Sequence, residues 1–111
     1  MKQWEIYLFP FKEELPHPAV ILSNDERCTN KDFATVNALI CTSVRLNRDA
    51  KPFEAIFDQK DGLDWKTAVP CDVIYLLEKA RFVERRGEVS LPRRKEIAKK
   101  LAFSLRLPSP W

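Results

Sequence analysis

The histidine at position 17 is the residue with the most readily assigned chemistry, because it is the only histidine among 111 residues. An imidazole has an ordinary pKa of about 6.5, so it can accept or donate a proton near neutral pH. His17 lies between Pro16 and Pro18, and a histidine in that setting is equally a rigid turn residue with a solvated ring. Taken alone, the position leaves both interpretations open.

The remaining residue types exclude several kinds of site. Cys28, Cys41 and Cys71 are separated by 13 and 30 residues, so no two thiolates have zinc-binding spacing. Gly62 and Gly87, the only two glycines, are too few for a phosphate-binding loop or a dinucleotide fingerprint. We therefore expect no metal and no nucleotide cofactor. The odd number of cysteines and the lack of a secretory leader favour a reducing cytoplasm, where these thiols pack as small apolar side chains.

The formal net charge of +3 is unevenly divided along the chain. Residues 1–78 contain nine Lys and Arg against 13 Asp and Glu, whereas residues 79–111 contain ten against three. This asymmetry predicts a polyanion or an acidic protein as partner, although the solvated face of a helix shows the same pattern. No apolar run approaches the roughly 18 residues that span a bilayer, so we expect no membrane segment.

Short apolar segments predict the β-strands that must position these groups. The expected strands are Trp4–Phe9, Ala19–Leu22, Phe33–Thr42, Phe53–Phe57, a long strand Thr67–Leu77 with a bulge or edge at Pro70, and a short segment made of Phe82–Glu84 and Gly87–Val89. The polar residues 25–32 are expected to be irregular, and Asp61-Gly62 is expected to form a turn.

The end of the chain has the pattern of an amphipathic helix. Ser90 is a good N-cap and Pro92 is tolerated in the first turn. One face carries Ile97, Ala98, Leu101, Ala102 and Leu105, and the other carries Arg93, Arg94, Lys95, Lys99 and Lys100. Short strands followed by one helix predict a mainly β fold, a small antiparallel sheet or barrel closed by this C-terminal helix. We expect one domain over residues 1–107 and a short tail over 108–111.

Several stretches, taken in order, carry a family resemblance. They are Trp4–Leu8, His17–Asn24, Leu39–Ser43 with Pro52–Glu54, and Asp61–Leu63 leading to Val69–Asp72 and Gly87–Ser90. In this order the chain resembles the PemK/MazF-like toxins (Kid/CcdB-type fold) of bacterial toxin–antitoxin modules. The resemblance implies an SH3-like barrel with a terminal helix, a homodimer, and a metal-independent endoribonuclease (mRNA interferase) that cleaves single-stranded RNA and is restrained by an acidic antitoxin.

The resemblance also implies site residues. In the family, a Thr at the end of a strand and an Arg just before the Pro of the second strand are associated with cleavage. The Thr matches Thr42, whereas His17 occupies the position of the Arg. The family's acidic residue near the RNA path matches Asp72, followed by Val73 where a Gln is usual. The family's glycine-bearing first loop is replaced by the shorter segment 11–16.

Metal-free cleavage of RNA by the adjacent 2′-hydroxyl needs a base, an acid for the departing 5′-oxygen, and donors or a cation for the phosphorane charge. We expect His17 to do acid or base work and Thr42 to hold a phosphate oxygen by a hydrogen bond. The expected substrate-binding residues are Lys12, Ser43, Arg45 and Asp72. Ser43 and Arg45 could instead begin a polar loop, and Asp72 could pair with a structural cation.

Four further alternatives stay open at this level. Arg48 and Lys51 could extend a phosphate track formed with Lys12 and Arg45. The aromatic residues of the first strand, Trp4, Tyr7 and Phe9, could stack on bases, although such residues are typical of a core. The chain could also be a catalytically degenerate barrel that binds nucleic acid or protein without cleavage, or a toxin of the same fold that acts on DNA gyrase.

Overall fold

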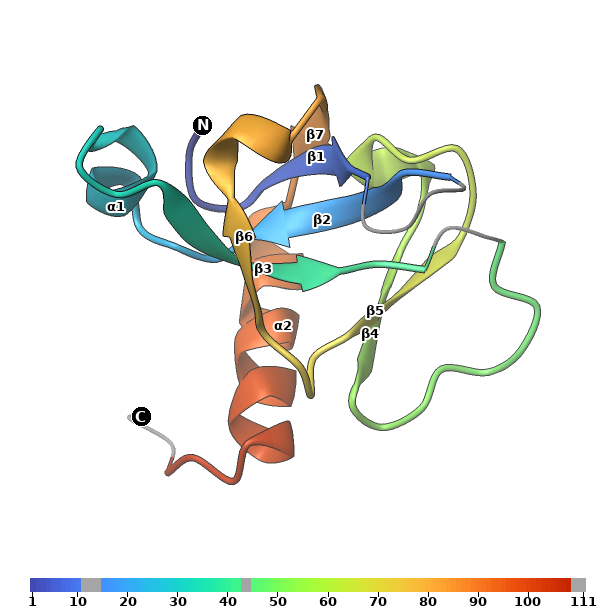
Figure 1. Ribbon diagram of the computed structural model, residues 1–111. Helices are drawn as coiled ribbons and strands as arrows, with labels where there is room; N and C mark the ends of the chain where they lie inside the picture. Colours follow the sequence, from blue (N-terminus) through green and yellow to red (C-terminus); the bar gives the residue numbers. More distant parts are fainter. Residues whose placement is uncertain (11–14, 43–44, 109–111) are drawn as a thin grey trace.

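The computed structural model describes residues 1–10, 15–42 and 45–108, and its strands form two antiparallel sheets (Figure 1). The larger sheet has the order β6-β3-β2-β1-β7, with β1 (Glu5–Phe9), β2 (His17–Ile21), β3 (Thr35–Ile40), β6 (Tyr75–Glu78) and β7 (Glu84–Glu88). The smaller sheet pairs β4 (Glu54–Phe57) with β5 (Thr67–Pro70). The helices are α1 (Asp25–Thr29) and α2 (Leu91–Ser104), with the 3-10 turns η1 (Gln59–Asp61) and η2 (Lys79–Arg81). The predicted mainly β fold with a C-terminal helix is confirmed, and closure of the strands into one barrel stays a prediction.

The core joins both sheets to α2. Its largest cluster contains Ile6, Val20 and Leu39 from the larger sheet together with Phe57 and Val69 from the smaller one. The one buried residue of α2, Ile97, completes this cluster, and Leu101 packs against it one helical turn later. The stripe that predicted the helix therefore docks it on the β core.

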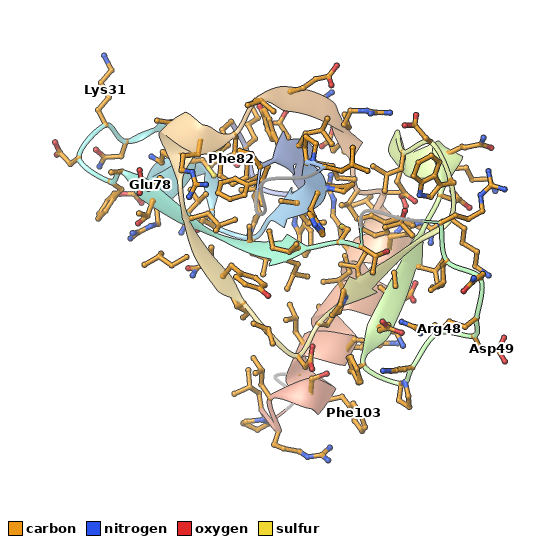
Figure 2. The ribbon with its side chains drawn as sticks, turned by 45° about the vertical axis from the view of Figure 1, so that its right-hand side comes forward. Lys31, Arg48, Asp49, Glu78, Phe82 and Phe103 are labelled. Atoms are coloured by element: carbon orange, nitrogen blue, oxygen red, sulfur yellow. The ribbon has the colours of Figure 1, made fainter. Side chains whose placement is uncertain are left out.

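The aromatic residues of the first strand belong to the core, and their predicted alternative as base-stacking residues is wrong for Phe9, which is 1% exposed. Phe9 and Tyr7 both meet Phe82 edge to face, with ring centroids 4.9 and 6.0 Å apart. Figure 2 shows Phe82 against the larger sheet and Phe103 at the end of α2 that points away from it. Trp4 packs against the largest core cluster, and its φ of 71° places the start of β1 one residue later, at Glu5.

Two predicted elements are wrong. The single strand expected over Thr67–Leu77 is two strands in different sheets, because the chain stays on β4 up to Cys71, whose N–H donates to the Phe53 carbonyl at 2.9 Å, and then crosses to β3. Residues 25–32, expected to be irregular, begin with α1. Asn24 caps this helix by accepting from the Arg27 N–H at 2.9 Å, and Cys28 is its buried residue.

Arginines of the C-terminal third pair with carboxylates of the rest of the chain. Arg85 contacts Glu5 at 2.5 Å, Arg86 contacts Asp64 at 2.8 Å, and the Arg93 Nε lies 3.0 Å from the Asp61 carboxylate. Asp61 is 2% exposed, and this burial raises its pKa despite the neighbouring guanidinium. Part of the uneven charge that predicted an anionic partner is therefore satisfied inside the molecule. On α2, Lys95 and Lys99 are exposed and have no ion pair with the described residues.

Neither α1 nor α2, nor any other helix over the described residues, has the length and apolar character that crossing a membrane requires.

Candidate active site

His17 and Thr42 come together because β2 and β3 are antiparallel neighbours. Ala19 pairs with Ile40 and Val20 with Leu39, and continuing this register by two residues places His17 opposite Thr42. Opposite residues of an antiparallel pair have their side chains on the same face. Figure 1 shows the start of β2, the chain that leaves β3 and the connection between β4 and β5 on one side of the molecule. The two residues expected to take part in cleavage therefore share one site.

The ring of His17 is oriented by the backbone. Its Nδ1 lies 2.9 Å from the carbonyl oxygen of Cys41. Because a carbonyl oxygen only accepts hydrogen bonds, this contact assigns the proton to Nδ1. In the neutral ring the basic lone pair then belongs to Nε2.

Thr42 connects the two sheets. Its N–H donates to the Ala68 carbonyl at 3.0 Å, and its hydroxyl oxygen accepts from the Ala68 N–H at 3.2 Å. Both bonds join the end of β3 to β5, so the Thr42 side chain is held at the junction between the sheets. A hydroxyl can accept and donate at the same time, so the Thr42 hydroxyl can also act as a hydrogen-bond donor.

Thr42 lies between two hollows of the surface. The first, of about 200 Å³, is lined by His17, Thr42, Pro70 and Tyr75 among others, and we call it the His17 hollow. The second, of about 160 Å³, is lined on one side by Thr42 and on others by Trp65 and Arg86, and we call it the Arg86 hollow. The site is therefore an open groove centred on Thr42 and not an enclosed cavity.

Among the described residues, the others predicted to bind substrate do not line the His17 hollow. Arg45 is exposed and lines a third hollow, of about 380 Å³, together with Trp65 and Lys66. Asp72 is exposed on the connection between β5 and β6, next to Val73, which lines the His17 hollow. Lys12 and Ser43 lie outside the described residues.

Sequence reasoning missed three side chains of the site: Tyr75 in the His17 hollow, and Trp65 and Arg86 in the Arg86 hollow. None of them belongs to a motif. The position of Arg86 directly before Gly87 was the one local signal, since a glycine in a strand often marks a close approach of two backbones.

Arg48, predicted as part of a phosphate track, is committed to a structural contact. Its guanidinium binds both carboxylate oxygens of Glu54, at 2.7 and 2.9 Å. Glu54 is 3% exposed and also accepts from the Lys51 N–H at 2.8 Å. This arrangement ties the chain that follows the site to β4, beside which Figure 2 places Arg48.

The bond to Arg48 lowers the pKa of Glu54, which gives the contact a pH dependence. Because the folded-state pKa is below the unfolded one, this stabilisation is present above the unfolded value of about 4.3 and is lost as the pH falls through the folded value. We expect Glu54→Gln to lower the free energy of unfolding by roughly 1–3 kcal/mol at pH 7. The difference from wild type should shrink at pH 3, as measured by urea unfolding. An equal difference at both pH values would contradict the ionic role of Glu54.

The two cysteines beside the site are packed and not reactive. Cys41 and Cys71 are at most 1% exposed. Burial raises the pKa of the Cys41 thiol, and raises that of Cys71 to about 11, so both stay protonated near neutral pH. The predicted packing role of the three cysteines, all buried and unpaired, is confirmed. Within the described ranges, no three His, Cys, Asp or Glu side chains form a group that could hold a metal ion.

Comparisons with known proteins agree with this fold. A mycobacterial endoribonuclease solved in complex with its cognate antitoxin is 26% identical, with a TM-score of 0.79, and 99% of each chain is covered. A mycobacterial endoribonuclease structure is 27% identical, with a TM-score of 0.77 and coverage of 99% of this chain and 95% of that one. A MazE–MazF complex from Deinococcus radiodurans is 21% identical, with a TM-score of 0.76 and 97% of each chain covered, and shows the fold alone. No curated protein sequence matches. Because the model of the PemK-like, MazF-like toxins of type II toxin–antitoxin systems matches residues 2–105, the chain belongs to that family.

Proposed function

We propose that this chain is a toxin-like endoribonuclease that cleaves single-stranded RNA without a metal ion, in the cytoplasm. The observation that carries the proposal is that His17 and Thr42, from the neighbouring chain segments of β2 and β3, line the same hollow. One of these groups can move a proton near neutral pH and the other can donate a hydrogen bond to a phosphate oxygen. Membership of a toxin family and two mycobacterial endoribonucleases of the same fold support the same activity.

In the proposed reaction His17 is the general base. Its Nε2 accepts the proton of the ribose 2′-hydroxyl, and the 2′-oxygen attacks the neighbouring phosphorus. The hydroxyl hydrogen of Thr42 donates to a non-bridging phosphate oxygen as charge develops on it. The bond from phosphorus to the 5′-oxygen breaks, and that oxygen leaves with a proton from solvent. The products are a 2′,3′-cyclic phosphate and a 5′-hydroxyl end. Arg45 and Asp72 are proposed as contacts to the flanking RNA, as are Lys12 and Ser43 from the sequence alone.

Incubation of the pure protein with a long single-stranded RNA in EDTA tests this proposal. Wild type should cleave, and Thr42→Ala should be slower by about 10²-fold, because it lacks a donor to the developing charge. Thr42→Ser retains the hydroxyl and should keep most of the activity. Equal thermal midpoints would show that loss of the bond from the Ala68 N–H has not unfolded the alanine variant.

The same experiment separates the second candidate, a degenerate barrel that binds without cleavage. It is favoured by one observation: His17 stands where the resemblance places an Arg, so the site lacks that cation. RNA that is bound by wild type but not cleaved would support this second function and reject the first.

We further propose a homodimer and an acidic antitoxin as partners. Large apolar side chains are exposed on both β6 and α2, with Leu76 64% and Phe103 53% exposed, and a second copy would cover such residues. The exposed Lys95 and Lys99 of α2 suit an acidic segment, and one mycobacterial relative was solved with its cognate antitoxin. The mass of the pure chain in solution measures the first of these assemblies.

A further inference from the structure

The site continues beyond Thr42 along a line of three hollows. The His17 hollow and the Arg86 hollow share Thr42, while the Arg86 hollow and the third hollow share Asp64 and Trp65. Because neighbouring hollows share these residues, a ligand strand that lies beside His17 and passes Thr42 would next meet Trp65. We call the part beyond Thr42, lined by Arg86, Trp65, Lys66 and Arg45, the Trp65 track.

Trp65 occupies the middle of this track. It lies on the connection between η1 and β5, it is half-buried, and it lines both the Arg86 hollow and the third hollow. The core tryptophan of this fold is Trp4, which packs against the largest apolar cluster, whereas Trp65 is not part of any core cluster. An indole that is positioned by the fold but open to a groove is suited to stacking on a nucleobase.

Cations line both of the hollows that Trp65 lines. Arg86 lies in the hollow shared with Thr42, and Arg45 and Lys66 lie in the hollow beyond. Two carboxylates also line the track, but Asp64 contacts Arg86 at 2.8 Å and Asp58 lies 3.4 Å from the Arg93 guanidinium. An arginine has five N–H donors, and over the described residues Arg86 uses one of its terminal nitrogens on the 65%-exposed Asp64. The remaining donors suit a phosphate, which arginine can bind in a bidentate manner.

We propose that the nucleotide next to the cleaved one stacks its base on Trp65 and that Arg86 binds its phosphate, with Lys66 and Arg45 continuing the contact to the RNA backbone. This rests on the proposed function, since the track begins at Thr42 and its occupant must be continuous with the substrate there. The same alternation of aromatic ring and cation distinguishes an RNA strand from an apolar peptide, which would gain nothing from Arg86 and Lys66.

The role of Trp65 is tested by three substitutions and two readouts. One readout is the rate of cleavage of a long single-stranded RNA in EDTA at limiting RNA concentration. The other is the dissociation constant of a fluorescein-labelled, random-sequence RNA that is 2′-O-methylated and cannot be cleaved. Trp65→Ala should lower the cleavage rate and raise the dissociation constant, each by about ten-fold, as loss of one stacked base does. Trp65→Phe should stay close to wild type, whereas Trp65→Leu, which is apolar but not aromatic, should behave like the alanine variant.

The role of Arg86 is tested by opposite changes of charge. Arg86→Gln should weaken RNA binding and reduce the slope of log K against log salt by about one. Asp64→Asn removes the competing carboxylate, so it should tighten binding while leaving that slope no smaller than in wild type. Thermal midpoints close to that of wild type would show that neither the change at the partly buried Arg86 nor that at the exposed Asp64 has altered the fold.

The outcomes separate this inference from the proposed function. Cleavage by wild type together with unchanged values for Trp65→Ala would overturn the inference and leave the proposed function standing. Equal values for Trp65→Leu and wild type would overturn it as well, because the indole would then act only by packing. Binding without cleavage by wild type would reject the proposed function, and weaker binding by Trp65→Ala would still support the track. Absence of RNA binding by wild type would reject both. If Trp65→Ala lost binding to an acidic peptide while its rate of RNA cleavage and its dissociation constant for RNA were unchanged, the track would be assigned to a protein partner.

Discussion

His17→Ala is expected to lower the rate of RNA cleavage by ~10²- to ~10⁴-fold, which is the range that a positioned proton-transfer group contributes. The Nδ1 contact to the Cys41 carbonyl holds the ring in one orientation and leaves the lone pair of the neutral ring on Nε2. Alanine removes both the base and its orientation. The measurement is the initial rate on single-stranded RNA in EDTA, with RNA binding determined separately on the 2′-O-methylated analogue.

His17→Asn is the matched control. Its side-chain amide can still donate to the Cys41 carbonyl, but it has no group that accepts a proton near neutral pH. If proton transfer is the role of His17, the asparagine variant cleaves RNA as slowly as the alanine variant. Its free energy of unfolding is at least as large as that of the alanine variant. Near-normal cleavage by His17→Asn would contradict that role and would leave His17 as a residue that holds the start of β2 against the end of β3.

The elements that the sequence predicts well have a periodic apolar face. The continuous run Ala19–Leu22 predicts a buried strand, and β2 covers residues 17–21. The stripe through Ile97 and Leu101 predicts α2, which begins directly after Ser90 as expected. In these elements the residues that form the apolar pattern are also the residues that the core buries, so the sequence pattern alone is enough to identify the elements.

The elements that it misses are defined by contacts with distant residues. The five residues of α1 are too few to show a helical period, and Cys28 is their only buried side chain. The break inside Thr67–Leu77 has no apolar signal, since residues on both sides of it are apolar. The chain leaves β4 after Cys71 because its next partner is β3, and that choice depends on the register of Ala38 opposite Tyr75.

The residues of the candidate site also fall into those that the sequence predicts and those that it does not. His17 and Thr42 can be proposed from a family resemblance, and the register of β2 and β3 explains why residues 25 positions apart meet. Trp65 and Arg86 come from two further segments, and no spacing in the sequence relates them to Thr42. What relates them is a close crossing of the backbone, and the chain uses both of its glycines there.

Gly62 and Gly87 lie against one another. A Cβ built on Gly62 would overlap the carbonyl oxygen of Arg86, and a Cβ built on Gly87 would overlap the carbonyl oxygen of Asp61. Gly62 also has a φ of 91°, in the region that side chains rarely adopt. The crossing fixes the end of η1 against β7, so it sets the distance at which Asp64 meets Arg86. The scarcity of glycine in this chain thus has a local meaning, since both glycines occur where two backbones must touch.

Gly62→Ala is expected to lower the free energy of unfolding by about 3 kcal/mol or more, because it combines a backbone clash with a left-handed conformation. Gly87→Ala introduces only the backbone clash, so we expect it to lower the free energy of unfolding by about 1–3 kcal/mol. Urea unfolding of the pure variants measures both values. Lys60→Ala, an exposed change in η1 next to the crossing, should stay within about 0.5 kcal/mol of wild type. A Gly62→Ala variant as stable as wild type would mean that η1 and β7 are not in contact.

The double variant Gly62→Ala, Gly87→Ala distinguishes a shared crossing from two separate glycine effects. Each added methyl group must push the same two backbone segments apart, so once the first has separated them, the second has less to displace. The loss of stability in the double variant should therefore be smaller than the sum of the two single losses by at least about 0.5 kcal/mol. Additive losses would indicate that each glycine is required for its own local conformation. In that case the placement of Arg86 in the hollow that it shares with Thr42 would not depend on the crossing.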